Sequence, residues 1–337
     1  MQQRILGRTG RPVSVVGLGT WQLGSDWGEV SDSDALAVLE ASADAGVTFF
    51  DTADVYGDGR SETIIGRFLA ATGDNDFTVA TKIGRRVEQV PENYTLDNFR
   101  QWLDRSRKNL GVETIDLVQL HCPPTAVYSD DRVFDALDQL VEDGVISNYG
   151  VSVETTGQAL TAIARPNVAS VQIIFNLFRQ KPLDEILPAA EAAGVGIIAR
   201  VPLASGLLSG RYSTETTFPP DDHRSYNRHG EAFDVGETFA GVDYAVGVAA
   251  AQEFTEEVAE FSAEPPFDDI DLTPAKAALA WIIQQPGVTT VIPGARNIEQ
   301  ARSNASAADV PELGPLFERG VRQLYDLYFR EAVHSRW

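Results

Sequence analysis

The sequence has one cysteine, Cys122, and no long apolar run. A lone cysteine cannot form an internal disulfide, and the first residues, Met1 to Arg4, lack the apolar core of a signal peptide, so we expect a reducing, cytoplasmic location. No stretch approaches the roughly 18 consecutive apolar residues that a membrane-spanning helix needs. We therefore expect a protein that does not enter a membrane.

Basic residues are also scarce. The 27 lysines and arginines stand against 49 aspartates and glutamates, which gives a formal net charge of −22. The few lysines are widely spaced, so the chain offers no basic patch to a phosphate backbone or to an anionic lipid surface. We therefore expect neither nucleic acid nor a membrane surface as a partner. The oligomeric state cannot be inferred from the sequence.

The apolar content points to one α/β domain. With 43% hydrophobic residues, the 337-residue chain can bury a full core. Helical patterns repeatedly end in a glycine followed by a valine, because glycine suits the left-handed residue after a helix and valine suits the strand that follows. This junction occurs at Gly46-Val47, Gly111-Val112, Gly144-Val145, Gly194-Val195 and Gly287-Val288.

Short apolar runs alternate with these helical patterns. Such alternation predicts parallel strands joined by right-handed crossovers, and eight of them predict a (β/α)8 TIM barrel. A doubly wound open sheet is the alternative, but its dinucleotide fingerprint needs a third glycine after Gly17 and Gly19, which is missing at the required spacing. The expected strands are 13–18, 47–51, 77–82, 115–121, 146–152, 168–175, 195–200 and 288–293.

Two features should extend this barrel. Residues 4–12 place a Thr-Gly turn between two short segments, which predicts an N-terminal β-hairpin. Residues 205–273 form a long connection after the seventh strand, and residues 233–261 within it contain enough Ala, Val and Phe for helices, so we expect an ordered insertion. No linker composition divides the chain, and residues 1–337 should form a single domain.

Polar residues follow three successive predicted strands. Asp51 ends the second strand and Tyr56 lies in the loop after it, while Lys82 ends the third strand and His121 the fourth. Active sites of (β/α)8 barrels lie at the carboxyl ends of the strands, so these four side chains should converge. Singly, Asp51 and Lys82 could be a structural salt bridge and Tyr56 a rim residue; the combination favours a site.

These residue types suit the protonation of an oxygen on which negative charge develops. A tyrosine has a pKa near ~10, and a neighbouring ammonium lowers that pKa. Lys82 would supply the ammonium, Asp51 would keep Lys82 charged, and His121 would position a carbonyl oxygen beside the hydroxyl of Tyr56. Reduction of a carbonyl group is the expected reaction.

Other polar residues are expected to be structural. His223, His229 and His334 lie in polar stretches without metal-ligand spacing, which predicts solvated side chains and no metal site, so a metal-dependent hydrolase is disfavoured. We also expect solvated charge at Asp221 and Asp222. Asp54 is expected to be a hydrogen-bonding loop residue, and Cys122 a small apolar side chain.

The chain resembles the aldo-keto reductases over essentially its whole length. Each matching segment is weak alone, but their order is specific, and together they imply the barrel fold and oxidoreductase chemistry. The segments are Val16–Trp21, Asp51–Gly57 with Ser61, Glu62 and Gly66, Ala80–Lys82, Asp116–His121, Gly150–Ser152, Val171–Gln172, Asn176–Leu177, Pro202–Leu207 and Ile292–Ala295.

The resemblance implies roles for particular residues. Tyr56 would be the general acid, His121 would orient the substrate, and Lys82 with Asp51 would tune Tyr56. The cofactor would be NADPH, with NADH possible, and the substrate a small aldehyde or ketone. Residues implied to bind the cofactor are Gly19, Thr20, Ser152, Gln172, Arg200, Pro202, Leu203, Ser205, Leu207, Arg211, Gly294, Arg296, Gln300 and Asn304.

Some positions depart from the family pattern. Val153 replaces the usual asparagine after Ser152, and Arg200 replaces an aromatic residue beside the nicotinamide, where its charge would favour the reduced cofactor. Trp21 and Trp27 are expected to wall the substrate pocket. The alternative function is a redox-sensing subunit of the same fold that binds cofactor but turns over little.

Overall fold

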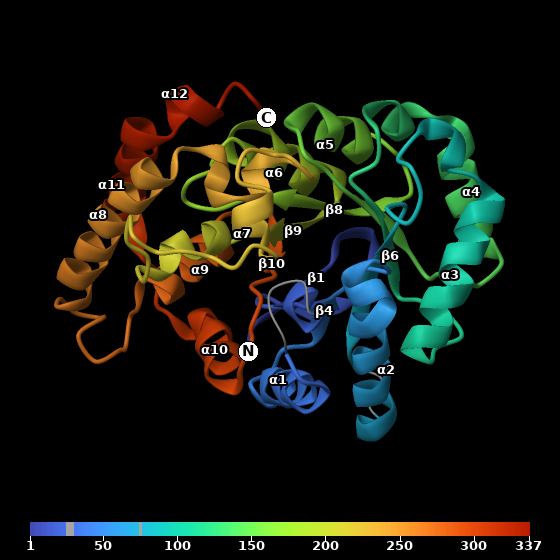
Figure 1. Ribbon diagram of the computed structural model, residues 1–337, viewed down its shortest axis with the longest axis horizontal. Helices are drawn as coiled ribbons and strands as arrows, with labels where there is room; N and C mark the ends of the chain where they lie inside the picture. Colours follow the sequence, from blue (N-terminus) through green and yellow to red (C-terminus); the bar gives the residue numbers. More distant parts are fainter. Residues whose placement is uncertain (25–29, 74–75) are drawn as a thin grey trace.

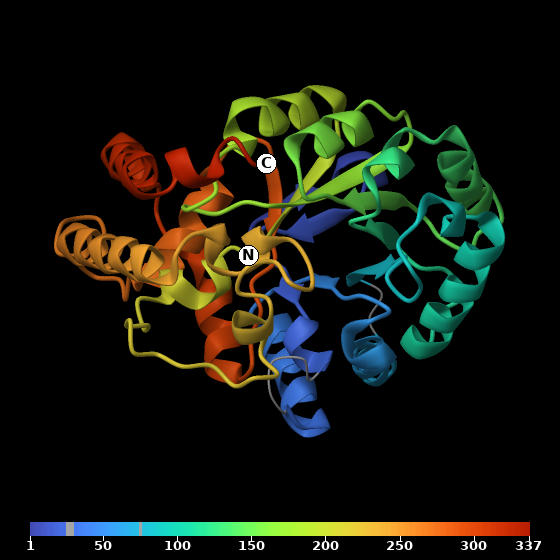
Figure 2. The same cartoon turned by 45° about the horizontal axis from the view of Figure 1, so that its top comes forward.

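Eight parallel strands form a closed barrel surrounded by helices (Figures 1 and 2). The computed structural model describes residues 1–24, 30–73 and 76–337. Each strand pairs with the next one in the sequence, and bridges from Val16 to Val291 and from Gly19 to Gly294 join the last strand to the first. The strands are β3 (Leu18–Gly19), β4 (Phe49–Asp51), β5 (Thr78–Ile83), β6 (Leu117–His121), β7 (Tyr149–Ser152), β8 (Val168–Ile174), β9 (Gly196–Arg200) and β10 (Val288–Val291).

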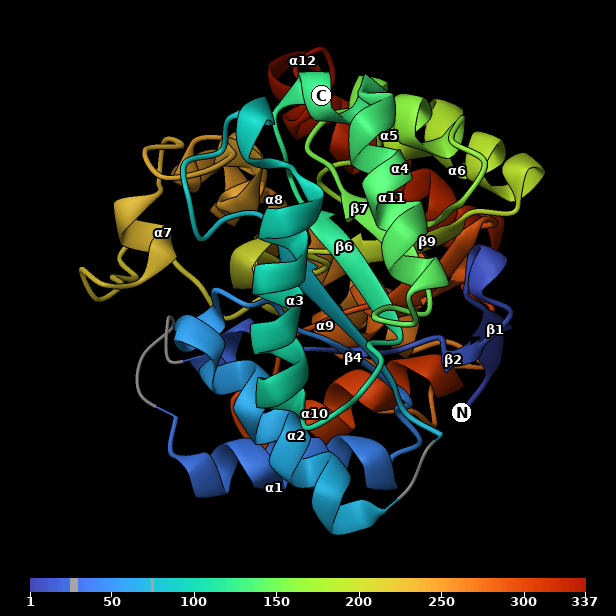
Figure 3. The ribbon, with the colours of Figure 1, turned by 90° about the vertical axis from the view of Figure 1, so that its right-hand side faces the viewer.

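The predicted TIM barrel and the N-terminal hairpin are confirmed, but the first expected strand, 13–18, is wrong. Its first part belongs to β2 (Pro12–Ser14), which pairs antiparallel with β1 (Gln3–Ile5). The barrel strand is the two-residue β3. Both Val13 and Val15 are buried, so hydrophobicity alone does not show where one sheet ends and the other begins. In Figure 3 the hairpin lies at one end of the barrel and α7 at the other.

The helices begin and end at the residue types that favour such ends. The Ser31 side chain accepts a hydrogen bond from the Asp34 amide at 3.1 Å, and the Thr273 side chain accepts one from the Lys276 amide, so both helices begin at an N-cap. The glycines of the five predicted junctions all have positive φ. The barrel helices are α1 (Asp32–Asp44), α2 (Arg60–Thr72), α3 (Leu96–Leu110), α4 (Asp131–Glu142), α5 (Thr156–Ile163), α6 (Pro182–Ala193), α9 (Pro274–Gln284) and α10 (Ile298–Ala305), followed by α11 (Gly314–Tyr328) and α12 (Arg330–Val333).

The long connection after β9 is ordered and partly helical. Its main helix, α8 (Tyr244–Ser262), packs against α11 through aromatic contacts such as Phe261 with Phe317, whose ring centroids are 5.2 Å apart. Figure 1 shows α8, α11 and α12 together beyond one side of the barrel. The remaining elements of this connection are η6 (Ala204–Ser209), α7 (His223–Tyr226), η7 (Val235–Glu237) and η8 (Phe239–Gly241).

The barrel interior sets the direction of the candidate site residues. Successive side chains of a strand point to opposite faces, so Phe49 and Asp51 of β4 face the same way, as do Ala80 and Lys82 of β5. A buried cluster fills the lower interior, and polar residues follow it at the carboxyl ends. The cluster contains Leu6, Val13, Phe49, Ala80, Leu117, Ile198 and Ile292.

Within the part of the chain that the structure describes, no helix combines the length and apolar character needed to cross a bilayer.

Two helical glycines provide a test of the packing. A Cβ on Gly66 in α2 would lie 2.6 Å from the Asn109 carbonyl oxygen of α3, whereas a Cβ on Gly157 in α5 would meet only Thr155 Oγ1 at 3.9 Å. We expect Gly66→Ala to lower the free energy of unfolding by about 1–3 kcal/mol, since backbone must move. The matched Gly157→Ala should be neutral or stabilising by up to ~1 kcal/mol. Urea unfolding of both variants measures this, and equal midpoints would contradict the packing of α2 on α3.

Candidate active site

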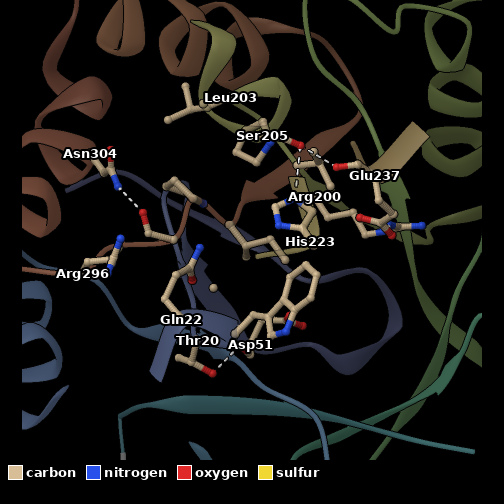
Figure 4. Close-up of a pocket in the computed structure, with 18 of the residues that line it drawn as sticks. Thr20, Gln22, Asp51, Arg200, Leu203, Ser205, His223, Glu237, Arg296 and Asn304 are labelled. Atoms are coloured by element: carbon tan, nitrogen blue, oxygen red, sulfur yellow. Dashed lines mark hydrogen bonds and ion pairs between the residues drawn. The ribbon is translucent and has the colours of Figure 1, made fainter. Parts of the chain in front are cut away.

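A cavity of about 770 Å³ opens at the carboxyl ends of the strands. Asp51, Tyr56 and His121 line one part of it, and Arg296, just before α10, and Asn304, in the last turn of α10, line another. Figure 4 shows Asn304 and Arg296 on the opposite side of the cavity from Arg200 and Glu237. The cavity is large enough for an extended ligand together with a small second molecule.

Lys82 is at the centre of the polar cluster. Its Nζ donates to Asp51 Oδ1 at 2.5 Å, to the Thr52 carbonyl oxygen at 2.8 Å and to the Tyr56 hydroxyl at 3.3 Å. Lys82 and Asp51 are buried, whereas Tyr56 is only partly buried and lines the cavity. The cluster therefore presents the tyrosine hydroxyl to the cavity and keeps the ion pair behind it.

Burial raises the pKa of Tyr56 above its ordinary value of 10, and Lys82 acts in the opposite direction without reversing the shift. The expected net lowering of this pKa is therefore wrong. Burial lowers the pKa of Lys82, but Asp51 and Tyr56 outweigh burial, and the pKa lies above its ordinary 10.5. At neutral pH the site thus holds a protonated phenol beside a charged ammonium.

His121 is neutral in this environment. Burial, helped by the positive charges of Arg85, Lys82 and Arg200, holds the pKa of His121 well below 6.5. Its ring lies edge-on to Tyr56, with the ring centroids 6.0 Å apart. Within the described part of the chain, the buried Nδ1 has no hydrogen-bond partner. A neutral imidazole with free hydrogen-bonding capacity can orient a polar ligand atom at Tyr56.

The second carboxylate oxygen of Asp51 is also occupied. Gln172 Nε2 donates to Asp51 Oδ2 at 2.7 Å and Gln119 Nε2 donates to the same oxygen at 3.1 Å. Gln172 was expected at the cofactor carboxamide; it lines the cavity, but its amide nitrogen is committed to Asp51. Gln119 was missed, although it stands two residues before His121 on β6 and therefore shares the inward face.

Trp21 lies between the tyrosine and the insertion. Its ring stacks 6.0 Å from Tyr56, and it contacts His223 at 5.2 Å and Phe233 at 5.8 Å on its other flanks. His223 was expected to be solvated, and this is wrong, since only 1% of it is exposed and it lines the cavity. The polar residues around it, Asp222, Arg224 and Asn227, are buried as well, so a polar sequence does not indicate exposure here. Trp27 lies outside the described residues.

Asp222 is likewise buried, contrary to the expectation of solvated charge, and only Asp221 is exposed. The Asp222 carboxylate accepts two hydrogen bonds from Arg224, at 2.8 and 2.6 Å, and caps α7. Hydrogen bonds from Arg224 and His223 hold the pKa of Asp222 below its usual range, although burial alone would raise it. The pair therefore fixes α7 beside Trp21.

Arg200 forms an ion pair that the sequence did not predict. Its guanidinium contacts Glu237 of η7 and donates to the Val153 carbonyl oxygen at 2.9 Å. Glu237 offsets the charge that was expected to favour the reduced cofactor, so that argument is weakened. Ser205 Oγ donates to the Glu237 carbonyl oxygen at 2.5 Å, which ties η6 to η7.

Most residues implied to bind a cofactor line the cavity. Leu207 is the exception, since it is fully buried and packs towards Gly247 of α8. Arg211 and Arg296 are exposed, and Asn304 Nδ2 donates to the Gly294 carbonyl oxygen at 3.1 Å. Those that line the cavity are Gly19, Thr20, Ser152, Gln172, Arg200, Pro202, Leu203, Ser205, Arg211, Gly294, Arg296, Gln300 and Asn304.

Asp54 does not form the loop hydrogen bonds expected of its side chain. It is completely buried, and neither carboxylate oxygen has a hydrogen-bond partner within the described part of the chain. Burial, reinforced by the charge of Glu62, raises the pKa of Asp54 to about 7. Among the residues that the structure describes, no group of three or more His, Cys, Asp or Glu side chains is arranged to hold a metal ion.

The buried ion pair supports a stability prediction. Lys82→Met leaves the Asp51 carboxylate buried without its cation, so we expect the free energy of unfolding to fall by about 3–5 kcal/mol. Lys276→Met, the matched control, breaks the contact with the exposed Asp271 and should cost less than ~1 kcal/mol. Urea unfolding measures both, and a small effect at Lys82 would contradict the role of the ion pair.

The Aldo/keto reductase family model matches residues 15–315. An uncharacterised oxidoreductase of Bacillus subtilis is 30% identical over 318 residues, which cover 93% of each chain, and one of Mycobacterium tuberculosis is 34% identical over 88% of this chain and 85% of its own.

The glycerol dehydrogenase from Gluconobacter oxydans has a similar structure, with a TM-score of 0.76 and 30% identity. The match covers 97% of this chain and 95% of that chain. The sequence matches extend across the barrel, and the structural match includes nearly all of the chain. This chain therefore belongs to the aldo/keto reductase family.

Proposed function

We propose that this protein reduces an aldehyde or ketone to an alcohol with a nicotinamide cofactor. The observation that carries the proposal is the Tyr56 hydroxyl, held 3.3 Å from the Lys82 ammonium at the wall of the cavity that also contains His121. A protonated phenol beside a buried cation can give a proton to an oxygen and remain stabilised afterwards as an anion.

The four residues then have separate tasks. Tyr56 is the general acid, and its raised pKa keeps the proton available at neutral pH. Lys82 stabilises the phenolate that forms when the proton leaves. Asp51 keeps Lys82 charged, and His121, as a neutral imidazole, donates a hydrogen bond to the carbonyl oxygen and holds it beside the Tyr56 hydroxyl.

The cavity suits an extended dinucleotide. The unpartnered His121 Nδ1 marks a polar end beside Tyr56, while Arg296 and Arg211 supply cations elsewhere along the cavity wall. A Cβ on Gly294 would lie 2.0 Å from Gln22 Nε2, so the end of the Gln22 side chain packs directly on this glycine at the cavity wall. When bound, the nicotinamide would supply the hydride to the carbonyl carbon.

The same reaction can run in reverse as alcohol oxidation, and the structural relative named as a glycerol dehydrogenase supports chemistry at an alcohol carbon. The substrate would enter beside Trp21, between Tyr56 and the aromatic side chains of His223 and Phe233. These walls favour a small carbonyl compound with an apolar portion.

NADPH is the proposed form of the cofactor. Arg296 is exposed at the cavity wall next to the start of α10, where its guanidinium can bind a 2′-phosphate in a bidentate manner. Its backbone amide is already fixed, since it donates to Gln300 Oε1 at 2.9 Å. NADH lacks that phosphate and would gain nothing from the guanidinium.

Tyr56→Phe tests the general acid. The variant keeps the ring and its stacking on Trp21 but loses the proton, so we expect kcat to fall by several orders of magnitude with cofactor affinity retained. The measurement is oxidation of NADPH with a panel of aldehydes and ketones. Near-native turnover by the variant would remove Tyr56 from its role. Cofactor binding by the wild type without turnover of any carbonyl would favour the redox-sensing subunit.

Arg296→Ala tests the cofactor form. Loss of a charge-assisted contact to the 2′-phosphate should raise KM for NADPH by roughly 10- to 100-fold and leave KM for NADH within about twofold. Arg302→Ala is the matched control, because Arg302 is an exposed arginine of α10 that does not line the cavity. Equal effects of Arg296→Ala on both cofactors would contradict the assignment.

A further inference from the structure

Asp54 is a buried acid that the proposed mechanism does not use. It is completely inaccessible to solvent, and both of its carboxylate oxygens lack a hydrogen-bond partner in the described part of the chain. An ionised carboxylate in such a place is unfavourable, because neither water nor a donor replaces its hydration. The neutral, protonated form fits the site better.

The charges around Asp54 do not remove this cost. Glu62 of α2 is also completely buried; it accepts hydrogen bonds from Thr81 at 2.6 Å and Asn109 at 2.9 Å, and its charge opposes a second one on Asp54. Arg86, Arg105 and the Val55 amide favour the ionised form of Asp54. Their combined effect is smaller than the opposing effect of burial and of the Glu62 charge.

Those two arginines bind elsewhere. Arg86 Nη1 donates to Asp58 Oδ1 at 2.6 Å and to the Asp54 carbonyl oxygen at 3.2 Å, and Arg105 Nη2 donates to Asp58 Oδ1 at 2.9 Å. The guanidinium groups are therefore committed to the exposed Asp58 and to the backbone of Asp54. The positive charges of the two arginines act on the Asp54 carboxyl group from a distance, but neither arginine donates a hydrogen bond to it.

Asp54 belongs to the loop that holds Tyr56. The Asp54 amide donates to the Lys82 carbonyl oxygen at 3.1 Å, and the Lys82 ammonium donates to the Thr52 carbonyl oxygen and to the Tyr56 hydroxyl. After Tyr56 the chain passes through three successive residues with positive φ, at 57° for Gly57, 53° for Asp58 and 91° for Gly59. Glycine adopts such angles without strain, so Asp58 is the one strained residue of the three, and it keeps this conformation only while its contacts persist.

We propose that Asp54 is a pH-sensitive positioning residue, which holds the loop 52–59 and its Tyr56 in the active arrangement while its carboxyl group is protonated. Loss of the proton places a second negative charge beside Glu62 in a buried site, where the two arginines and the Val55 amide compensate that charge only in part. The loop then moves so that the carboxylate reaches water or Arg86, and the Tyr56 hydroxyl leaves the Lys82 ammonium. This inference rests on the proposed function only for its kinetic consequence.

The pH range follows from the pKa values. The pKa of Asp54 is about 7, whereas the pKa of Tyr56 lies above 10 and that of His121 well below 6.5, so Asp54 is the group among these three that titrates between pH 6 and 9. We expect the wild-type kcat for carbonyl reduction to fall about tenfold for each pH unit above 7. The kcat of Asp54→Asn, a variant that mimics the protonated form, should change by less than about twofold up to pH 9.

Stability gives a readout that needs no activity. The pKa of Asp54 is about 7 in the folded state and near the ordinary value of 3.8 in the unfolded state, so the folded state binds the proton more tightly. Stability is therefore lost as pH rises between these values. The melting temperature of Asp54→Asn relative to wild type should therefore increase from pH 4 to pH 7 and then level off. Asp135→Asn, the same change at an exposed position of α4, should show no such trend.

If Asp54→Asn fails to fold, hydrogen exchange of the wild-type protein can still test the inference. Amides of residues 52–59, corrected for intrinsic exchange rates, should lose protection as pH rises through 7, while the strand β6 keeps its protection. A kinetic profile of Asp54→Asn that matches wild type, or flat protection of residues 52–59 from pH 6 to 9, would overturn the inference. If the wild type turned over no carbonyl compound but residues 52–59 still showed pH-dependent protection, the result would reject the proposed function and support the positioning role.

Discussion

The buried ion pair of Lys82 and Asp51 is the interaction on which the site depends. One ammonium binds a carboxylate, a backbone carbonyl and a phenol, and so fixes the end of β4, the loop after it and the end of β5 relative to one another. Two buried charges are costly unless every remaining lone pair and proton is satisfied. The carboxylate meets that condition through Gln119 and Gln172, so β6 and β8 also become part of the support.

The barrel explains why such a cluster can form from residues far apart in the sequence. Parallel strands bring their carboxyl ends to one rim, and the alternation of side chains decides which residues face inward. Apolar residues lower on the same faces exclude water from below the ion pair. The low polarity that strengthens the ion pair also raises the pKa of Tyr56 and keeps its proton in place, so one environment produces both effects.

Strand order and the convergence of Asp51, Tyr56, Lys82 and His121 could be predicted from sequence, because both follow from local periodicity and one rule of barrel topology. The division of strand 13–18 between two sheets could not, since Val13 and Val15 are buried in either case. His223 and Asp222 were misjudged for a related reason: a four-residue helix is too short for its inner face to show as a periodic pattern. The burial of Asp54 and the pairing of Arg200 with Glu237 depend on contacts between distant segments, which no local pattern encodes.

The insertion after β9 has an electrostatic role as well as a covering one. Arg200, at the end of β9, contacts Glu237, and Arg179, after β8, lies 3.6 Å from Asp234, so two buried arginines of the barrel rim find their acids in the same inserted segment. Burial lowers the pKa of Arg179 to about 9, although the charge of Asp234 acts in the opposite direction. If the insertion were displaced, both guanidinium groups would lose these acids next to the cavity. The insertion thus supplies the acids that pair with two buried arginines of the barrel, beside the wall where the proposed cofactor would bind.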